Sequence, residues 1–120
     1  MLDILTVDSL PVVVLTYGPS IPVTLLGGHL LQVTITDGVA FAFANPTGAL
    51  TPGALVLIRY INASGVAHGA GTFGTNYRVS AALAAVATGN SRTIGFLWTG
   101  IVAPGAGMVE VFRTAADVPN

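Results

Sequence analysis

Residues 31 to 43 read LQVTITDGVAFAF, and this stretch decides the fold class of the chain. Leu31, Val33 and Ile35 alternate with polar residues, which is the period of a β-strand that buries one face. Asp37-Gly38 then supplies a two-residue turn signal, and large and small residues alternate again up to Phe43. The pattern predicts a β-hairpin.

The same strand-and-turn chemistry extends in both directions. Fifteen Gly and seven Pro punctuate the sequence, and runs rich in Val, Ile, Leu, Thr and aromatic residues lie between them. Residues 55–61 are apolar on both faces, which predicts a central strand covered on both sides. The other predicted strands are residues 12–17, 23–26, 92–99 and 108–113. The predicted core residues are Phe41, Phe43, Leu57, Tyr60, Phe96, Trp98 and Val111.

The chain has 120 residues, which favours a single domain. The spacing of the runs predicts an all-β fold, a β-sandwich or jelly roll that is oligomeric. Residues 1–20 are expected to form an N-terminal arm or a first strand, and residues 21–120 the β-sandwich domain. Residues 79–89 contain strong helix formers followed by a glycine, so a short helix and an extended loop are both open there.

Charged residues make up only 8% of the chain, with four Arg, no Lys and five acids, whereas a typical domain has about 25%. Large neutral, apolar areas normally mark contact surfaces, so the composition predicts burial against other subunits. A net charge of -1 without a basic run argues against nucleic acid and against an anionic membrane surface as partners. The absence of cysteine excludes disulfides and thiol chemistry.

A hydropathy window would suggest a membrane span at residues 39–58, which carry no charge. The turn-forming stretches at 45–48 and 51–53 would leave backbone groups unsatisfied in hydrocarbon, so a membrane-spanning helix is not expected.

Motifs for catalysis or cofactors are weak. Residues 69–74 match the dinucleotide fingerprint by letter, but no amphipathic helix follows and no acid lies about 20 residues on. The possible general bases are His29, expected in a surface turn, and His68, and neither has a convincing partner. The acids Asp3, Asp8, Asp37, Glu110 and Asp117 are scattered. We therefore expect no catalytic, cofactor-binding or metal-binding residues.

Two further patterns have a structural and a functional interpretation. Asn62-Ala63-Ser64 fits the glycosylation sequon and also an ordinary turn, which we favour. Aromatic residues in the second half could form a sugar-stacking platform, but more often such residues fill a core. These aromatic residues are Phe73, Tyr77, Phe96, Trp98 and Phe112.

The order of turns and aromatic residues over residues 30 to 113 resembles a β-rich domain of tailed-phage virion proteins. The stretches that carry the resemblance are 45–48, 52–53, 62–65, 71–74, Tyr77, Ser80, 88–89, 92–100 and 109–113. Met108 departs from the pattern, which has a Trp before the Val-Glu pair. Such domains occur in tail-fibre and other surface-exposed virion proteins.

The resemblance implies a compact domain that forms homo-oligomers, trimers rather than dimers, on a phage particle. We favour a capsid decoration (cement) protein bound to the major capsid protein or other virion proteins, because no heptads or repeats are present to build a fibre shaft. The alternatives are a tail-fibre or receptor-binding module and, more remotely, a carbohydrate-binding protein or glycan hydrolase. The residues expected at oligomer or capsid contacts are Leu2, Ile4, Leu5, Val7, Leu10, His29 and Pro104.

Overall fold

The computed structural model describes residues 12–25, 30–48, 52–68, 71–101 and 107–120. These residues form ten strands, and no helix occurs among them. The strands are β1 (Val12–Val14), β2 (Ser20–Ile21), β3 (Leu30–Ile35), β4 (Phe41–Phe43), β5 (Leu55–Asn62), β6 (Gly71–Phe73), β7 (Tyr77–Arg78), β8 (Asn90–Trp98), β9 (Met108–Arg113) and β10 (Val118–Pro119). The prediction of an all-β fold is confirmed.

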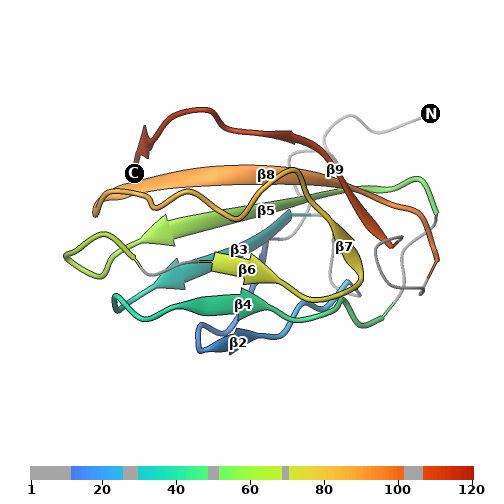
Figure 1. Cartoon of the computed structure of the whole chain (residues 1–120), viewed down its shortest axis with the longest axis horizontal. Helices are drawn as coiled ribbons and strands as arrows, with labels where there is room; N and C mark the ends of the chain where they lie inside the picture. The colour runs from blue at the N-terminus through green and yellow to red at the C-terminus, as the bar shows by residue number, and fades with distance from the viewer. Residues whose placement is uncertain (1–11, 26–29, 49–51, 69–70, 102–106) are drawn as a thin grey trace.

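The strands form two sheets (Figure 1). Sheet A has the order β1-β3-β5-β8-β9-β7, and β10 also pairs with β8. Sheet B has the order β2-β4-β6. The predicted central position of residues 55–61 is confirmed, because β5 lies between β3 and β8 and pairs with both.

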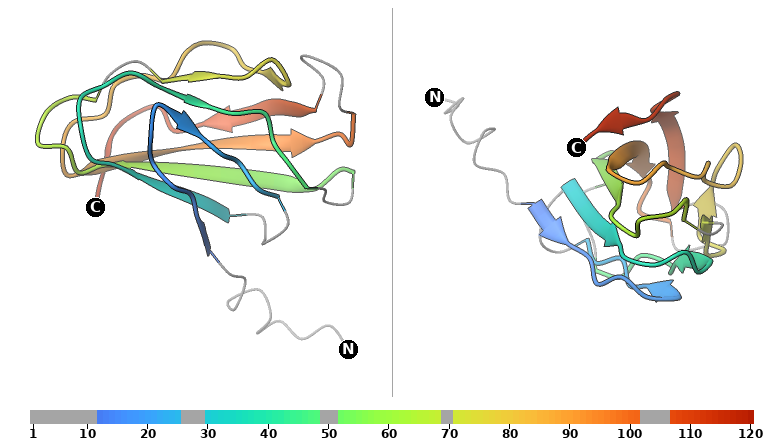
Figure 2. Two further views of the ribbon diagram at one scale, coloured as in Figure 1. Left: turned by 90° about the horizontal axis from the view of Figure 1, so that it is seen from below. Right: turned by 90° about the vertical axis from the view of Figure 1, so that its left-hand side faces the viewer.

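The first half of the chain winds between the two sheets. β1, β3 and β5 are parallel neighbours in sheet A, and β2, β4 and β6 are parallel neighbours in sheet B. The blue, teal and green parts of the chain therefore each cross from sheet A to sheet B (Figure 2). We call each such crossing pair of strands an arc. The second half adds antiparallel pairs, β5 with β8 and β8 with β9.

The predicted hairpin at residues 31–43 is wrong. β3 and β4 do not pair with each other, because β3 belongs to sheet A and β4 to sheet B. The turn at Asp37-Gly38 exists, but it carries the chain from one sheet to the other. Tyr17 of the preceding arc donates a hydrogen bond from its hydroxyl to Oδ1 of Asp37 at 2.5 Å, which ties two successive arcs together.

Residues 79–89 form an irregular, mostly extended segment with no helix. Leu83 makes an isolated bridge with Gly71, and its side chain and that of Val86 are buried in the core. Gly89 ends the segment with a φ of 78°, a conformation that favours glycine. Of the two interpretations that the sequence left open, the loop is therefore correct.

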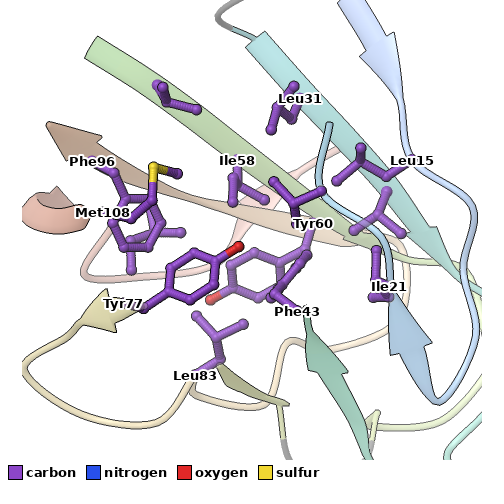
Figure 3. Packing of buried hydrophobic residues seen from close by; sticks show 14 of the residues in the cluster. Leu15, Ile21, Leu31, Phe43, Ile58, Tyr60, Tyr77, Leu83, Phe96 and Met108 are labelled. Carbon is purple, nitrogen blue, oxygen red and sulfur yellow. The ribbon is translucent and has the colours of Figure 1, made fainter. Parts of the chain in front are cut away.

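The buried core lies between the two sheets and draws on both (Figure 3). Sheet A contributes alternate residues such as Leu31, Ile58 and Phe96, and sheet B contributes Ile21 and Phe43. Such inward-facing side chains each add about 1.5 to 3 kcal/mol by leaving water. The winding thus fixes which face of each of these strands packs on the core.

Most of the predicted core residues lie in this cluster. Phe41, Phe43, Tyr60, Phe96 and Trp98 are all buried.

Two core assignments need correction. Leu57 is half-buried and points to the outer side of β5, because the inner side of that strand is formed by Val56 and Ile58. Val111 is 52% exposed. A β-bulge places Val111 as the extra residue of β9 opposite Gly95 and Phe96, and this shift interrupts the alternation on which the prediction relied.

Candidate interaction surface

The outer face of sheet A, which points away from the core, carries large apolar side chains in register. One row crosses five strands through Val12, Leu30, Leu57, Gly95 and Phe112. A second row joins Leu55, Leu97 and Val109 across β5, β8 and β9. We call these two adjacent rows the apolar rows.

The apolar rows are open to solvent in the single chain. Val12 is 46% exposed, Leu55 45% and Phe112 47%. Leu97 is also exposed, and Leu30, Leu57 and Val109 are half-buried. Residues 55–61 were predicted to be covered on both faces. Within the described chain, only the inner face of β5 packs on the core, so the second apolar face is exposed instead.

Phe112 has a dedicated place in the first row. A Cβ atom on Gly95 would overlap the Phe112 ring, so the absence of a side chain at Gly95 lets the ring lie across β8. In register, Gly95 lies between Leu57 of β5 and Phe112 of β9. An aromatic ring over a cross-strand glycine stabilises a sheet and here also makes its outer surface continuous and apolar.

A polar row borders the apolar rows. It joins Gln32, Arg59 and Thr93 in register, and the exposed apolar Val14 extends it on the edge strand β1. The Arg59 guanidinium donates hydrogen bonds to Gln32 Oε1 at 3.2 Å, Ser91 Oγ at 3.3 Å and Asn120 Oδ1 at 3.4 Å. All three of these acceptors are neutral, so the positive charge of Arg59 lies next to an apolar surface without compensation from them.

Sheet B presents a different outer face. Its central row is Ser20, Ala42 and Thr72, all small and uncharged. The two sheets therefore differ in what they offer a partner, and the large apolar side chains on an outer sheet face belong to sheet A.

The other charged groups of the described chain are engaged within it. Arg92 pairs with Asp117 at 2.8 Å, and Arg113 pairs with Glu110 at 2.7 Å. The hydrogen bond from Tyr17 lowers the pKa of Asp37, and burial, together with the Asp37 carboxylate, raises the pKa of Tyr17 to about 12. These pairs stabilise the fold locally. Because they are neutralised within the chain, they add little unpaired charge that a partner would have to desolvate at the outer face of sheet A.

Glu110 lies in a shallow hollow of about 280 Å³ beside Ser80 and Val109. Its carboxylate accepts two hydrogen bonds from the Arg113 guanidinium and one from the Ser80 amide at 2.8 Å. The Arg113 hydrogen bonds are the largest cause that lowers the pKa of Glu110 to about 2. A carboxylate held ionised in this way is the opposite of a general acid, which needs a raised pKa.

His68 is buried and serves the fold. Its Nε2 accepts a hydrogen bond from the Val86 amide at 3.0 Å, and its ring packs against Phe41 and Tyr60. The imidazole therefore joins the loop after β5 to the 79–89 segment. Among the described residues, no group of three or more His, Asp or Glu side chains is arranged to hold a metal ion.

The burial of Asn62 argues against its use as a glycosylation site. Asn62 is fully buried, and its amide donates to the carbonyls of Val66 and Val86 while its Oδ1 accepts from the amide and hydroxyl of Ser64. A glycan could not be attached there without unfolding the loop. The turn interpretation is confirmed.

The glycines of the apparent dinucleotide fingerprint serve packing where they are described. A Cβ on Gly71 would meet the Phe41 ring at 2.8 Å, and one on Gly74 would meet the backbone nitrogen of Asn45 at 3.0 Å. The segment that follows Gly74 is a turn and the short strand β7, and not the helix that phosphate binding requires.

The aromatic residues of the second half divide between core and surface. Phe73 stacks on Phe43 with ring centroids 5.4 Å apart, and Tyr77 contacts Phe96 at 5.6 Å. Trp98 is 4% exposed, so it is not available to stack on a sugar from solvent. Only Phe112 of the five lies exposed on a sheet face.

The residues predicted to make oligomer or capsid contacts fall outside the described ranges. This applies to all seven: Leu2, Ile4, Leu5, Val7, Leu10, His29 and Pro104. The apolar rows were missed at the sequence level. Their signal is the apolar second face of residues 55–61, which predicts a strand covered on both sides and does not say by what.

No protein-family model, curated protein or solved structure matches the chain. Within the described ranges, no helix is long and apolar enough to cross a lipid bilayer.

Proposed function

We propose that the chain is a structural protein of a tailed-phage particle, a capsid decoration protein that assembles as a homo-oligomer on the capsid surface. The apolar rows on the outer face of sheet A are the observation that carries this proposal. A soluble single chain rarely leaves a continuous apolar patch uncovered, and such patches normally mark contact surfaces.

Three features support the proposal together. The order of turns and aromatic residues resembles virion β-domains. The charged groups of the described chain are few, and most of them pair within it. Two sheets with one shared core are also the arrangement that a sandwich requires. A jelly roll is built from antiparallel strands, whereas the first six strands here pair in parallel, so the sandwich is the form we retain.

In this role the protein would act mechanically. Apolar faces buried between subunits and capsid add interface area that resists internal pressure on the shell. Association of this kind depends on area, shape and preorganisation together. A rigid sheet face meets the last of these requirements because its rows are fixed by strand register.

The copy number of the chain in purified phage particles tests the proposal. Decoration predicts hundreds of copies per particle and a shell that weakens when the protein is lost. A tail-fibre module, the alternative, predicts few copies and a loss of adsorption. A full chain that stays monomeric at micromolar concentration in light scattering would count against both.

A carbohydrate-binding role has less support, because Trp98 is in the core and the exposed ring of Phe112, among the described residues, packs against Gly95. Binding of the chain to a glycan array, lost on Phe112→Ala with the fold intact, would favour that role over the structural one.

A further inference from the structure

We propose that residues 1–11 of one copy lie across the apolar rows of a second copy. This inference rests on the proposed self-association and names the surface and the segment that would produce it.

The segment and the face have complementary chemistry. Residues 1–11 read MLDILTVDSLP, with five large aliphatic residues and two acids, Asp3 and Asp8, and no base. The face offers two apolar rows bordered by Arg59, whose hydrogen-bond acceptors are neutral. Aliphatic side chains in the apolar rows would place an acid near the border, where it can pair with the Arg59 guanidinium.

The segment is long enough to cover the face. An extended chain spans at most about 3.3 to 3.6 Å per residue, so eleven residues reach roughly 36 to 40 Å. The five strands of the first row are separated by four spacings of about 4.8 Å, or roughly 19 Å. One segment can therefore cross the whole row and reach the second.

The junction with β1 favours a second copy over the same copy. Folding back onto its own sheet requires a tight reversal next to Val12, and a β-turn centred on Pro11 and Val12 would need Val12 to leave β1. Proline also biases the preceding residue, Leu10, toward an extended conformation. A return onto the same sheet would therefore cost the pairing of Val12 with Leu30, whereas a contact with a second copy requires no such reversal.

An exchange of this kind is head-to-tail, because the giving segment and the receiving face are different surfaces. Head-to-tail contacts close into rings, including trimers, when the rotation between copies allows it. Every copy then gives one segment and receives one.

The test uses two variants of the 120-residue chain. One variant disables the segment and the other disables the face. The segment variant carries Ile4→Asp and Leu5→Asp. The face variant carries Leu55→Asp and Leu97→Asp, two exposed neighbours in the second row. The control variant carries Ser20→Asp and Thr72→Asp, which add the same charge to the outer face of sheet B at exposed positions.

Light scattering and analytical ultracentrifugation are read at equal concentrations. We expect the control to associate like the unmodified chain, and each test variant alone to associate at least tenfold more weakly. A mixture of the two test variants should recover a one-to-one complex, because one retains a working face and the other a working segment. Trp98 fluorescence and circular dichroism check that every variant is folded.

Three outcomes would overturn the inference. These are an unchanged oligomer in a folded test variant, a mixture that stays monomeric, and a control that dissociates as much as the test variants. If the unmodified chain is itself monomeric, the proposed self-association fails together with the inference. If it is oligomeric and the folded test variants keep the oligomer, only the inference fails. If Leu55→Asp and Leu97→Asp together prevent folding, Phe112→Ser replaces them.

Discussion

At the scale of single residues, glycines make room for asparagine side chains that hold the loops. Asn45 accepts a hydrogen bond from the Asn76 amide at 2.7 Å, and Asn76 in turn accepts one from the Gly107 amide at 3.1 Å. Gly74 lies directly against Asn45, and Gly107 against Asn76. These contacts join the end of β4 to the turn before β7 and to the start of β9.

Gly74→Ala should lower the free energy of unfolding by about 1 to 3 kcal/mol, because the new Cβ would overlap Asn45 Oδ1, which is held by the backbone amide of Asn76. Urea unfolding followed by circular dichroism measures the change. Gly18→Ala is the matched control, since the nearest atom to its new Cβ would be the Ser20 carbonyl oxygen at an ordinary 3.8 Å. Equal stability of the two variants would show that the close contact at Gly74 has no energetic weight.

Glu110 should make stability depend on pH. Its pKa of about 2 in the folded chain is below the ordinary value of 4.5, so its stabilisation is present at neutral pH and is lost as pH falls from about 5 to 2. Glu110→Gln should cost about 1 to 2 kcal/mol at pH 7, with solvent screening included, and should flatten the acid limb of the stability profile. Chemical unfolding at several pH values tests this. A parallel acid limb in the variant would assign the dependence to other groups.

At the scale of elements, local pattern predicted the strands better than it predicted their partners. The buried side of β3 and the bounds of β9 follow from the sequence. The turn at Asp37-Gly38 has the same chemistry in a hairpin and in an arc. The parallel pairing of β3 with β5 decides between them. The first residue of β5 lies twenty positions beyond the end of β3, and a local sequence pattern cannot show a pairing over that separation.

The exposed apolar face of sheet A was predictable in kind and not in place. Scarce charge indicated that some outer face is covered. The apolar outer side of β5 was visible in the sequence, but it reads the same whether a part of the same chain or another molecule covers it. Val111 was misplaced because the bulge at Gly95 and Phe96 depends on how β8 and β9 meet.

Asn62 connects β5 to the 79–89 segment through its buried amide. Asn62→Ala would leave the Val86 carbonyl and the Ser64 amide without this partner, and should lower the free energy of unfolding by about 2 to 4 kcal/mol. In hydrogen exchange, the Asn62→Ala variant should open faster than the unmodified chain in residues 79–89, with a smaller change in β3. Thr36→Ala, an exposed change beside β3, is the control. Unchanged exchange in the segment would mean that other contacts hold it.

At the scale of the whole molecule, the two sheets share one core. Trp98, the single tryptophan, lies in sheet A and is buried in that core. Phe43 of sheet B and Phe96 of sheet A are both in contact with Phe73. We therefore expect one cooperative unfolding transition.

Thermal or urea unfolding should give coincident curves for Trp98 fluorescence and for far-ultraviolet circular dichroism. Phe73→Ala should lower the free energy of unfolding by about 2 to 4 kcal/mol, because the half-buried Phe73 ring contacts both sheets. Both curves should shift together. Val39→Ala is the control, because Val39 is exposed in the connection from β3 to β4. Separate transitions for the two signals would mean that the sheets unfold independently.

The winding of the first half also bears on how the chain is made. β1 and β3 depend on β5 for their place in sheet A, and β5 depends on β8, which begins at Asn90. A growing chain on the ribosome would thus carry the open edge of β5 until most of its length has been translated. Rapid release or a holding chaperone would keep nascent copies from joining through that edge.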